Sequence, residues 1–228
     1  MMVLWVLVLV LLILVVRIAI NVAPFLNIKP VAAEQLDALS LDGYDKVMFV
    51  AHPDDETFWG SSALQRDDYL VVCITRGYDG TRSTEFNKVV SSTGDKALIL
   101  SYPDKIGKKR SNWYFWKDDI SDDIETILSY KNWTEVVTHN SDGEYGHQHH
   151  KMVHSMVTDV YDDLGLDCDY YNFAKYYSPS ETIPSDVRLL SDDVYNRKME
   201  LVDVYSSQSY ARGKFEHMFR DEDWIKVR

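Results

Sequence analysis

The sequence is poor in the residues that mark several common classes of protein. Its only two cysteines, Cys73 and Cys168, lie far apart, and Cys73 sits in the apolar run 70–74, where we expect a buried thiol. The sequence therefore predicts no disulfide framework, which favours a reducing compartment for the folded part. Basic residues are also scarce: 24 lysines and arginines are outnumbered by 36 aspartates and glutamates, a formal net charge of −12. Because nucleic-acid binding depends on basic patches, we expect no nucleic-acid partner.

The first 20 residues lack charge, apart from Arg17, and have no polar face. The uninterrupted apolar run 1–16 is slightly short for a bilayer, which takes about 20 residues of helix. Residues 18–26 can extend the helix, and the long side chain of Arg17 can reach the interface. We therefore expect residues 1–26 to form a single membrane-spanning anchor, so that the membrane is itself a partner of the chain.

Two other interpretations of this segment are weaker. A cleaved signal peptide has basic residues before its apolar stretch and a small-x-small cleavage site, and the sequence shows no basic residue there and no clear site. A buried helix of a soluble protein has a polar face, which is missing. Arg17 and Lys29 follow the apolar stretch, whereas only the α-amine precedes it. The positive-inside rule therefore places the folded domain in the cytoplasm.

Beyond the anchor, residues 27–45 are predicted to form a connector with a short helix, and residues 46–228 the folded domain. Strand patterns alternate there with helical patterns. The predicted strands are 46–50, 69–75, 97–101, 135–139 and 170–177, and the predicted helices are 57–66, 83–92, 118–130, 147–164 and 192–206. This alternation predicts an α/β fold with a mostly parallel sheet and helices on both faces. Ligands of such sheets bind beyond the carboxyl ends of the strands.

No G-x-G-x-x-G motif follows the first predicted strand, which argues against a dinucleotide-binding protein. That strand is followed instead by Ala-His-Pro-Asp-Asp-Glu at 51–56. His52 and Asp55, three residues apart in a turn, can converge on one ion, while Asp54 can point elsewhere and handle a proton. An isolated cluster of this kind is more often a solvated turn in which an aspartate caps the next helix.

A second cluster follows the fourth predicted strand, where five of the seven histidines lie within residues 139–154. On a helix, His147 and His150 are about 60° apart and can face one site. His149 is predicted to point the opposite way, into solvent. His154 lies about 40° from His150 and is a rival ligand. Any one of these histidines alone would more often be a surface residue or a hydrogen-bonded core residue.

Both clusters lie where predicted strands end, so they are expected to meet at one edge of the sheet. Two histidines and one carboxylate form a ligand set for catalytic zinc, and the same set suits non-haem iron, so the residues leave the metal open. A spare carboxylate and a spare histidine beside the metal would form a hydrolytic pair. One would be a base for water and the other a stabiliser of the developing oxyanion.

At these residues the sequence resembles the superfamily of N-acetylglucosaminyl-phosphatidylinositol de-N-acetylases and related bacterial sugar deacetylases, the PIG-L-like proteins. The matching segments are AHPDDE at 51–56 and GHQHH at 146–150, supported by ITRGYDGTRSTE at 74–85 and SYPD at 101–104. The resemblance covers most of the region between residues 46 and 154, and it implies a Rossmann-like fold. It also implies that zinc is held by His52, Asp55 and His150.

The resemblance implies roles for the other residues of the site. Asp54 corresponds to the general base, and His147 to the group that stabilises the oxyanion or donates a proton. Tyr145 matches a mobile tyrosine that assists the carbonyl in some relatives. Arg82 and Asp104 match positions that contact substrate.

Two features depart from the family pattern. Gln148 and His149 stand where relatives commonly have Pro-Asp or Ser-Asn, which adds a third nearby histidine. The C-terminal quarter, including Tyr-Ser-Ser-Gln at 205–208, fits the family only loosely. If this quarter shapes the acceptor pocket, the group attached to the sugar is left open.

The resemblance implies hydrolysis of the N-acetyl group of an N-acetylglucosamine unit, giving a free amine and acetate. Together with the anchor it favours N-acetylglucosaminyl-phosphatidylinositol, and so GPI precursor biosynthesis, at the endoplasmic reticulum membrane if the source is eukaryotic. One alternative is deacetylation of a soluble or envelope N-acetyl sugar conjugate, with the anchor serving only localisation. Another is a metal-binding membrane scaffold without turnover. Acetate release distinguishes the scaffold from the enzyme, whereas zinc binding does not.

Overall fold

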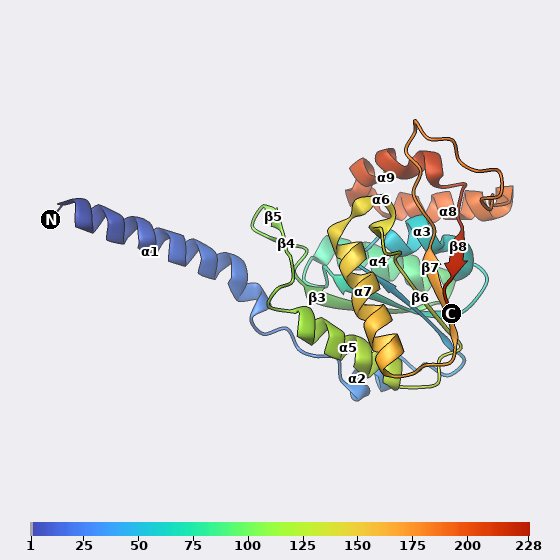
Figure 1. Cartoon of the computed structure of the whole chain (residues 1–228), viewed down its shortest axis with the longest axis horizontal. Coiled ribbons are helices and arrows are strands. Elements are labelled where there is room, and N and C mark those ends of the chain that lie inside the picture. Colours follow the sequence, from blue (N-terminus) through green and yellow to red (C-terminus); the bar gives the residue numbers. More distant parts are fainter. Residues whose placement is uncertain (1) are drawn as a thin grey trace.

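The computed structural model describes residues 2–228, which form a long N-terminal helix and an α/β domain (Figure 1). Helix α1 (Met2–Val22) extends away from the domain, and a 3₁₀ turn (Ala23–Phe25) joins it to the rest of the chain. The segment Trp5–Phe25 has a mean hydropathy of 3.0, and its most apolar window is 0% buried. The predicted helix is therefore present. Its length and composition suit a bilayer span, and a signal sequence meets the same criteria.

A six-stranded sheet forms the centre of the domain, in the order β3-β2-β1-β6-β7-β8. Its strands are β1 (Lys46–Val50), β2 (Tyr69–Thr75), β3 (Lys96–Tyr102), β6 (Glu135–Thr138), β7 (Asp169–Phe173) and β8 (Trp224–Lys226). Five strands run parallel, and β8 pairs antiparallel with β7. The mostly parallel sheet is thus confirmed. Because β1 pairs with β2 on one side and with β6 on the other, the strand order reverses at β1 and β6.

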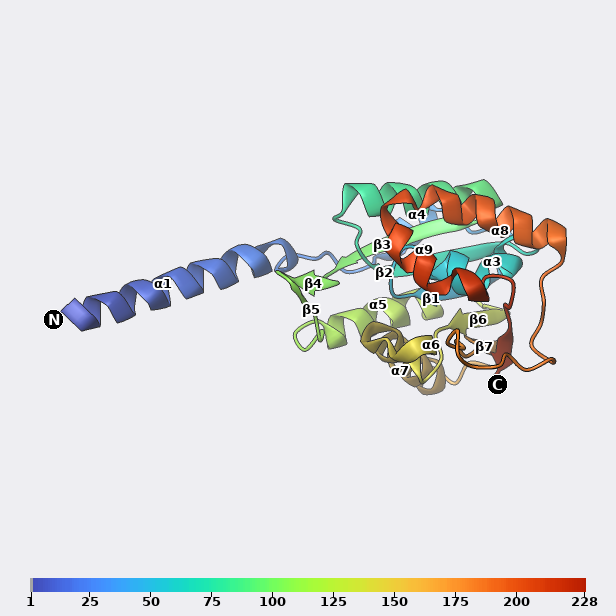
Figure 2. The same ribbon diagram turned by 90° about the horizontal axis from the view of Figure 1, so that it is seen from above.

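Helices cover both faces of this sheet (Figure 2). One face carries α3 (Asp55–Leu64), α4 (Gly80–Thr93), α8 (Asp192–Val204) and α9 (Ser209–Phe215), and the other carries α2 (Ala33–Ala38), α5 (Lys117–Ser129) and α7 (Gln148–Asp163). The short α6 (Gly143–Gly146) precedes α7, and a hairpin of β4 (Lys105–Ile106) and β5 (Lys109–Arg110) follows β3. The α/β fold with helices on both faces is as predicted.

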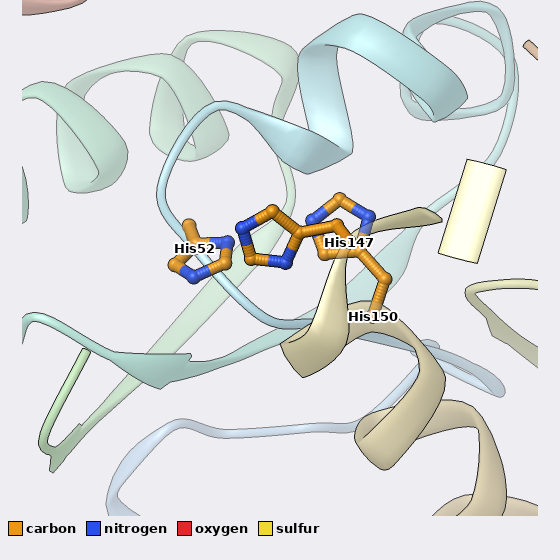
Figure 3. A group of neighbouring side chains, drawn as sticks. All are labelled: His52, His147 and His150. Atoms are coloured by element: carbon orange, nitrogen blue, oxygen red, sulfur yellow. The ribbon is translucent and has the colours of Figure 1, made fainter. Parts of the chain in front are cut away.

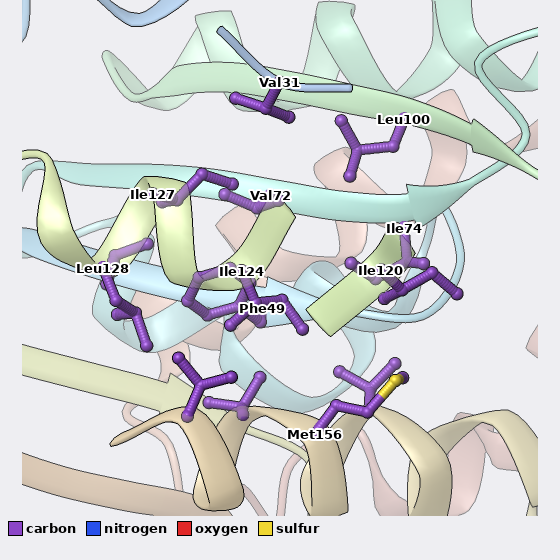
Figure 4. Packing of buried hydrophobic residues seen from close by; sticks show 14 of the residues in the cluster. Val31, Phe49, Val72, Ile74, Leu100, Ile120, Ile124, Ile127, Leu128 and Met156 are labelled. Carbon is purple, nitrogen blue, oxygen red and sulfur yellow. The ribbon is translucent and has the colours of Figure 1, made fainter. Parts of the chain in front are cut away.

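The core is divided between the two faces because side chains alternate along each strand. In β1, Val47 and Phe49 belong to the cluster packed against α5 and α7, whereas Met48 and Val50 belong to the cluster under α3, α4 and α8. Figure 4 shows the first cluster, with Phe49 among the isoleucines of α5. Burying each such side chain contributes about 1.5–3 kcal/mol. These contacts fix β1, and with it the turn that follows its last residue.

The connector at 27–45 packs against this first cluster. Val31, Leu36 and Leu41 are buried in it, and the Val31 N–H donates to Asp123 Oδ1 at 2.6 Å. Phe25, just before the connector, is buried in the same cluster. The chain therefore joins the folded core immediately after α1, rather than through a free linker.

Most predicted elements are found, with ends that differ by a few residues. The strands predicted at 46–50 and 69–75 have the predicted bounds, whereas the strand predicted at 170–177 ends at Phe173. The β4–β5 hairpin, α6, α9 and β8 were not predicted. None of these exceeds seven residues, so none is long enough to show a clear hydrophobic period.

Candidate active site

Both sequence clusters meet at the carboxyl ends of β1 and β6, where the strand order reverses. Ala51-His52 follows β1, and His139-Asn140 follows β6. A pocket of about 320 Å³ opens there. It is lined by His52, Asp54, Asp55, Phe58, Arg76, Arg82, Asp104, Lys105, Arg110, Tyr145, His147, Gln208, Tyr210, Ala211, Lys214 and Phe215. Reversal points of this kind are where open α/β sheets bind ligands.

The turn after β1 directs its two aspartates differently. Asp55 begins α3, and its Oδ2 accepts a hydrogen bond from the His52 N–H at 2.8 Å. Asp54 has a φ of 115°, a left-handed conformation that residues other than glycine rarely adopt, although aspartate and asparagine do so more often than most. The Arg82 guanidinium donates to the carbonyl of Pro53, between His52 and Asp54. The side chains of Asp55 and Arg82 thus hold this turn in place. The turn points the carboxylates of Asp54 and Asp55 in different directions.

The three residues expected to hold a metal converge around the Asp55 carboxylate. His52 Nδ1 lies 3.2 Å from Asp55 Oδ2, and His150 Nε2 lies 3.3 Å from Asp55 Oδ1. His147 is close as well: one ring nitrogen from each of His52, His147 and His150 lies within 4.8 Å of the others (Figure 3). The geometry therefore brings the three expected ligands and His147 close together, with each of His52 and His150 in contact with Asp55.

Glu144 sets the protonation of the His150 ring, a role that the sequence did not predict. Its buried Oε2 accepts a hydrogen bond from His150 Nδ1, which leaves His150 Nε2 facing Asp55. Among residues 2–228, this buried Nε2 has no hydrogen-bond partner. A carboxylate behind a histidine, with the second nitrogen left free, is the arrangement that holds metal-binding histidines. The donors around Asp55 thus fit a divalent cation of the zinc class.

His139 belongs to the same hydrogen-bond network. Its Nε2 accepts from the Ala51 N–H at 2.9 Å, so the proton of a neutral ring is on Nδ1, which donates to Glu144 Oε2 at 3.2 Å. Both nitrogens are occupied, so His139 supports Glu144 and is a poor metal ligand. Burial alone would raise the pKa of Glu144, but contact with the rings of His139 and His150, both of which hydrogen-bond to it, lowers that pKa to about 2. Glu144 is therefore ionised at neutral pH.

The prediction that His149 points into solvent is wrong. His149 is fully buried and stacks on Trp113, with ring centroids 4.0 Å apart. The helix α7 begins at Gln148, and the segment after the β4–β5 hairpin covers its first turn. His149 Nε2 donates to the Ser111 carbonyl at 2.7 Å, so Nδ1 is free to accept from His52 Nε2, 3.1 Å away. With its proton on Nε2, a neutral His52 ring carries its lone pair on Nδ1, which faces Asp55.

His147 precedes α7 instead of lying on it, with a φ of −68° and a ψ of 125°. The predicted helical angle between His147 and His150 therefore does not apply, although both rings reach the site. His147 Nδ1 accepts from the His149 N–H at 3.2 Å and lies 3.1 Å from Arg110 Nη1. The proton of the neutral ring is then on Nε2. Burial and the neighbouring cationic groups lower the pKa of His147, so it is neutral at neutral pH.

The rival ligand His154 does not join the site. Its Nδ1 lies 2.9 Å from the carbonyl of His139, to which it can donate. Among the described residues, His154 is absent from every cluster of side chains whose donors lie close enough to share an ion. His154 lies about one helical turn beyond His150 on α7, so its ring is further from the pocket and faces the backbone that follows β6.

Asp54 is a buried carboxylate at the edge of the pocket. Its Oδ2 lies 3.2 Å from Arg82 Nη2. Burial raises the pKa of Asp54 to about 8, and the charge of Asp55 adds to this rise, whereas Arg82 opposes it. A bound divalent cation would act in the same direction as Arg82. The expected substrate-contacting residue Arg82 thus lines the pocket but is held against Asp54.

Asp104 also lines the pocket, and Arg76 holds it in place. Asp104 Oδ2 accepts two hydrogen bonds from the Arg76 guanidinium, one of them at 3.1 Å. Its Oδ1 lies 3.5 Å from His52 Nε2 and, within residues 2–228, has no hydrogen-bond partner. Burial alone would raise the pKa of Asp104, but contact with His52 and Arg76 outweighs burial and lowers that pKa. Asp104 is therefore an ionised acceptor beside His52.

The C-terminal quarter completes the pocket through two buried glutamates. Tyr205 Oη donates to Glu56 Oε1 at 2.5 Å, and the Ser207 N–H and hydroxyl donate to Glu85 at 2.9 Å and 2.6 Å. These bonds tie the segment after α8 to α3 and α4. They place Gln208 and the residues of α9 in the pocket wall. Tyr145 packs there against Phe215, with ring centroids 4.7 Å apart.

Replacing Glu144 with glutamine should weaken metal retention while leaving the ligands in place. The amide keeps the size of the side chain but loses the charge that holds His150 Nδ1. Outer-shell changes of this kind typically cost about 10–100-fold in metal affinity or activity. Competition with a chelator measures the affinity. Equal affinity in the parent and in Glu144→Gln would show that Glu144 has only a structural role.

Comparison with known proteins identifies the family. Residues 47–161, half of the chain, match the family described as GlcNAc-PI de-N-acetylase, or PIG-L. The chain belongs to the PIG-L family. An uncharacterized protein of Acanthamoeba polyphaga mimivirus is 34% identical over 133 residues. That match covers 51% of this chain and 57% of the viral protein, so the chain spans a little over half the length of this relative.

Solved structures share the fold at low sequence identity. The pseudoaglycone deacetylase Dbv21 has a TM-score of 0.55 at 16% identity, over 75% of this chain and 85% of that chain. A deacetylase of teicoplanin biosynthesis has a TM-score of 0.57 at 15% identity, over 80% and 98%. The hydratase GalB of Pseudomonas putida has a TM-score of 0.55 at 12% identity, over 76% and 84%. Because a hydratase shares this fold, the reaction of this PIG-L chain has to be argued from its site.

Proposed function

We propose that this chain is a metal-dependent de-N-acetylase that hydrolyses the N-acetyl group of an N-acetylglucosamine unit. The observation that carries the proposal is the buried Nε2 of His150, 3.3 Å from Asp55 Oδ1 and close to His52, with Asp54 and His147 lining the same pocket. Burial lowers the pKa of His150, but the carboxylates of Asp55 and Glu144 outweigh it and raise that pKa to about 10, so a bound cation would displace a proton from this ring. Family membership supports the same reaction class. The leading substrate is N-acetylglucosaminyl-phosphatidylinositol, the precursor in GPI biosynthesis.

His52, Asp55 and His150 would hold the metal, with zinc the first choice and Fe²⁺ an alternative for the same donors. When bound, such an ion lowers the pKa of water and polarises an amide carbonyl. The chain prepares the site for it, since His149 and Glu144 leave His52 Nδ1 and His150 Nε2 free to coordinate. Three protein ligands leave positions open for water and substrate.

The remaining residues would move protons and stabilise charge. Asp54 acts as the general base: it takes a proton from water while the water oxygen attacks the amide carbon. His147 Nε2–H donates to the oxyanion that forms, and Tyr145 lies beside it, with ring centroids 5.6 Å apart. The C–N bond then breaks, and the proton that Asp54 took from water passes to the departing nitrogen. The products are acetate and a free amine on the sugar.

The charge of the pocket supports an anionic substrate. In a chain of net charge −12, the lining includes the cationic residues Arg76, Lys105, Arg110 and Lys214 besides Arg82. Arg76 and Arg82 are paired with Asp104 and Asp54, whereas Lys105, Arg110 and Lys214 have no acidic partner within 4.0 Å among residues 2–228. A phosphodiester next to the sugar would match them.

The helix α1 supports a lipid-linked substrate held near a membrane. We propose that residues 1–26 anchor the chain as a single span, with the domain 46–228 on the cytoplasmic side, at the endoplasmic reticulum in a eukaryotic cell. Retention of the full chain by membranes after alkaline carbonate extraction would support the anchor. Recovery of a chain shortened by its first twenty-odd residues would support a signal peptide instead.

A panel of N-acetylglucosaminides tests the substrate class. Purified full-length chain is incubated with N-acetylglucosaminyl-phosphatidylinositol, with soluble N-acetylglucosaminides and with envelope-type conjugates, and acetate and free amine are both measured. The highest kcat/KM is expected for the phosphatidylinositol conjugate. Preference for a soluble sugar would favour the alternative deacetylase. Absence of acetate from every substrate by a fully metallated chain would favour the metal-binding scaffold.

A further inference from the structure

Residues 105–117 differ in composition from the rest of this acidic chain. The segment KIGKKRSNWYFWK holds five basic residues, four aromatic residues and no acidic residue. Four of the basic residues, Lys105, Lys108, Lys109 and Arg110, lie on the β4–β5 hairpin, and all four are exposed. Basic and aromatic side chains gathered in one short segment are typical of contact with the headgroup layer of an anionic membrane.

Two of the aromatic residues project from the domain on a fixed backbone. Tyr114 and Phe115 are 77% and 79% exposed. Their neighbours are buried and hydrogen-bonded: Trp113 Nε1 donates to the Pro103 carbonyl at 2.8 Å, and Trp116 Nε1 to the Phe25 carbonyl at 3.0 Å. The position of the exposed pair is therefore set by the core on both sides. Neighbouring exposed aromatic side chains of this size indicate a contact surface.

This segment lies beside the place where α1 meets the domain, and both views show it (Figures 1 and 2). The hairpin turn reaches the last turn of α1, since a Cβ at Gly107 would lie 3.4 Å from Asn21 Oδ1. Phe25 packs edge-on against Tyr78 and Trp116, with ring centroids 5.0 Å and 6.2 Å apart. The end of α1 is thus packed onto the domain, which sets the direction in which the helix leaves it.

An apolar groove of about 400 Å³ runs along this junction, between the end of α1 and the start of α5. Leu26 and Phe115 line it together with Phe25 and Trp116. A span over Trp5–Phe25 has 21 residues, about the length that crosses the hydrocarbon layer. A bilayer around α1 would therefore end at the level of Phe25, and so at this groove.

The same hairpin forms part of the active-site wall. Lys105 and Arg110 line the pocket, and Arg110 Nη1 lies 3.1 Å from His147 Nδ1. Lys108 and Lys109, between them, are exposed and do not line the pocket. The hairpin is therefore shared between the mouth of the active site and the face beside α1.

We propose that this face docks on an anionic bilayer surface, with the β4–β5 hairpin among the headgroups and Tyr114 and Phe115 at the edge of the hydrocarbon layer. The pocket then opens at the membrane surface, where a lipid-linked sugar can enter without leaving the bilayer. The docking rests on the anchor put forward under the proposed function. Asp118 and Asp119 lie in the first turn of α5 beside this face, and Asp119 lines the groove. The five basic residues of 105–117 outnumber them.

Spin labels on the full-length chain in vesicles test the docking. Single cysteines are placed at Phe115→Cys and, as a control, at Leu189→Cys, in a background of Cys73→Ala and Cys168→Ala. Leu189 is 66% exposed and lies three residues before α8. The helix α8 begins at the end of the domain away from α1 (Figures 1 and 2). Power saturation then compares access of oxygen, which concentrates in lipid, with access of a water-soluble nickel chelate. Vesicles contain phosphatidylcholine alone or phosphatidylcholine with phosphatidylserine.

In the mixed vesicles, the label at 115 should favour oxygen, whereas the label at 189 should favour the nickel chelate. Lys108→Gln and Lys109→Gln should each lower the ratio of docked to undocked protein about fivefold, equivalent to ~1 kcal/mol per lysine. Acetate release from a soluble N-acetylglucosaminide should stay unchanged, since neither lysine lines the pocket.

Three outcomes would overturn the docking, and they are distinguishable. Equal nickel access at positions 115 and 189 in a chain that resists carbonate extraction would overturn the docking and leave the anchor intact. Release of the chain by carbonate would overturn the anchor and the docking together. Identical oxygen access at 115 in the two kinds of vesicle would overturn the assignment of an anionic surface. Because none of these measurements uses turnover, they do not depend on whether the chain is a deacetylase.

Discussion

Replacing Asp54 with asparagine is expected to lower kcat by about 10²–10⁴-fold while the metal stays bound, which is the range for loss of a positioned general base. Asparagine keeps the size of the side chain and tolerates the left-handed backbone at this position, where φ is 115°. The effect should appear mainly in kcat, because the change removes proton transfer and spares substrate binding. Metal content and steady-state kinetics measure the two parts separately.

The pH dependence of activity gives a second test of the role of Asp54. A general base acts only when deprotonated, so activity should fall as the pH drops through the pKa of Asp54. Burial and the charge of Asp55 raise that pKa, which moves the acid limb to higher pH, and Arg82 opposes the shift. The part of the acid limb that Asp54 contributes should vanish in Asp54→Asn.

Asp55→Asn is the matched control, since the side chains are the same and the positions adjacent. This variant should weaken metal retention, and added metal should partly restore its activity. The division of roles would be wrong if Asp54→Asn released the metal. It would also be wrong if Asp54→Asn kept turnover within a few-fold of the parent.

The second large effect is expected from His150→Ala. Removing a ligand should reduce metal affinity by more than the about 10–100-fold expected for an outer-shell residue, and activity should fall in parallel with metal content. His154→Ala is the control on the same helix, because its ring bonds to the His139 carbonyl and not to the site. Full metal content in His150→Ala, with loss in His154→Ala, would reverse the assignment.

Much of the site follows from strand ends that the sequence shows plainly. The apolar runs before His52 and before His139 predict two buried strands, and parallel strands bring their carboxyl ends to one edge of the sheet. That was enough to place His52, Asp55 and His150 near one another, as the structure has them. Their role as ligands stays a prediction.

The supporting residues could not be derived from local patterns. Glu144 looks like an ordinary acidic residue in a turn, and contacts with Asn140, His139 and His150 in the folded chain fix its direction. Its only signal in the sequence is indirect: Glu144 and Tyr145 lie between two glycines, which indicates a turn, and only the structure shows that Glu144 has a φ of 53° there. His149 was misplaced because helical projection assumes that solvent surrounds the first turn of α7. The short hairpin and Trp113 cover that turn, and no periodicity reveals them.

The C-terminal quarter illustrates the same limit. The segment Tyr-Ser-Ser-Gln at 205–208 has a composition typical of a loop. Its contacts with Glu56 and Glu85 join residues more than 100 positions apart in the chain. Buried carboxylates of this kind need partners, but the sequence does not say which ones.

We expect acetate release to depend on a metal held at His52, Asp55 and His150. The most direct test strips the full-length chain of metal, adds Zn²⁺ in steps, and measures bound zinc and acetate from N-acetylglucosaminyl-phosphatidylinositol in the same samples. Acetate release is predicted to rise in proportion to bound zinc and to level off at about one ion per chain. Acetate release that does not depend on bound metal, or no acetate release at full occupancy, would contradict a metal-dependent deacetylase.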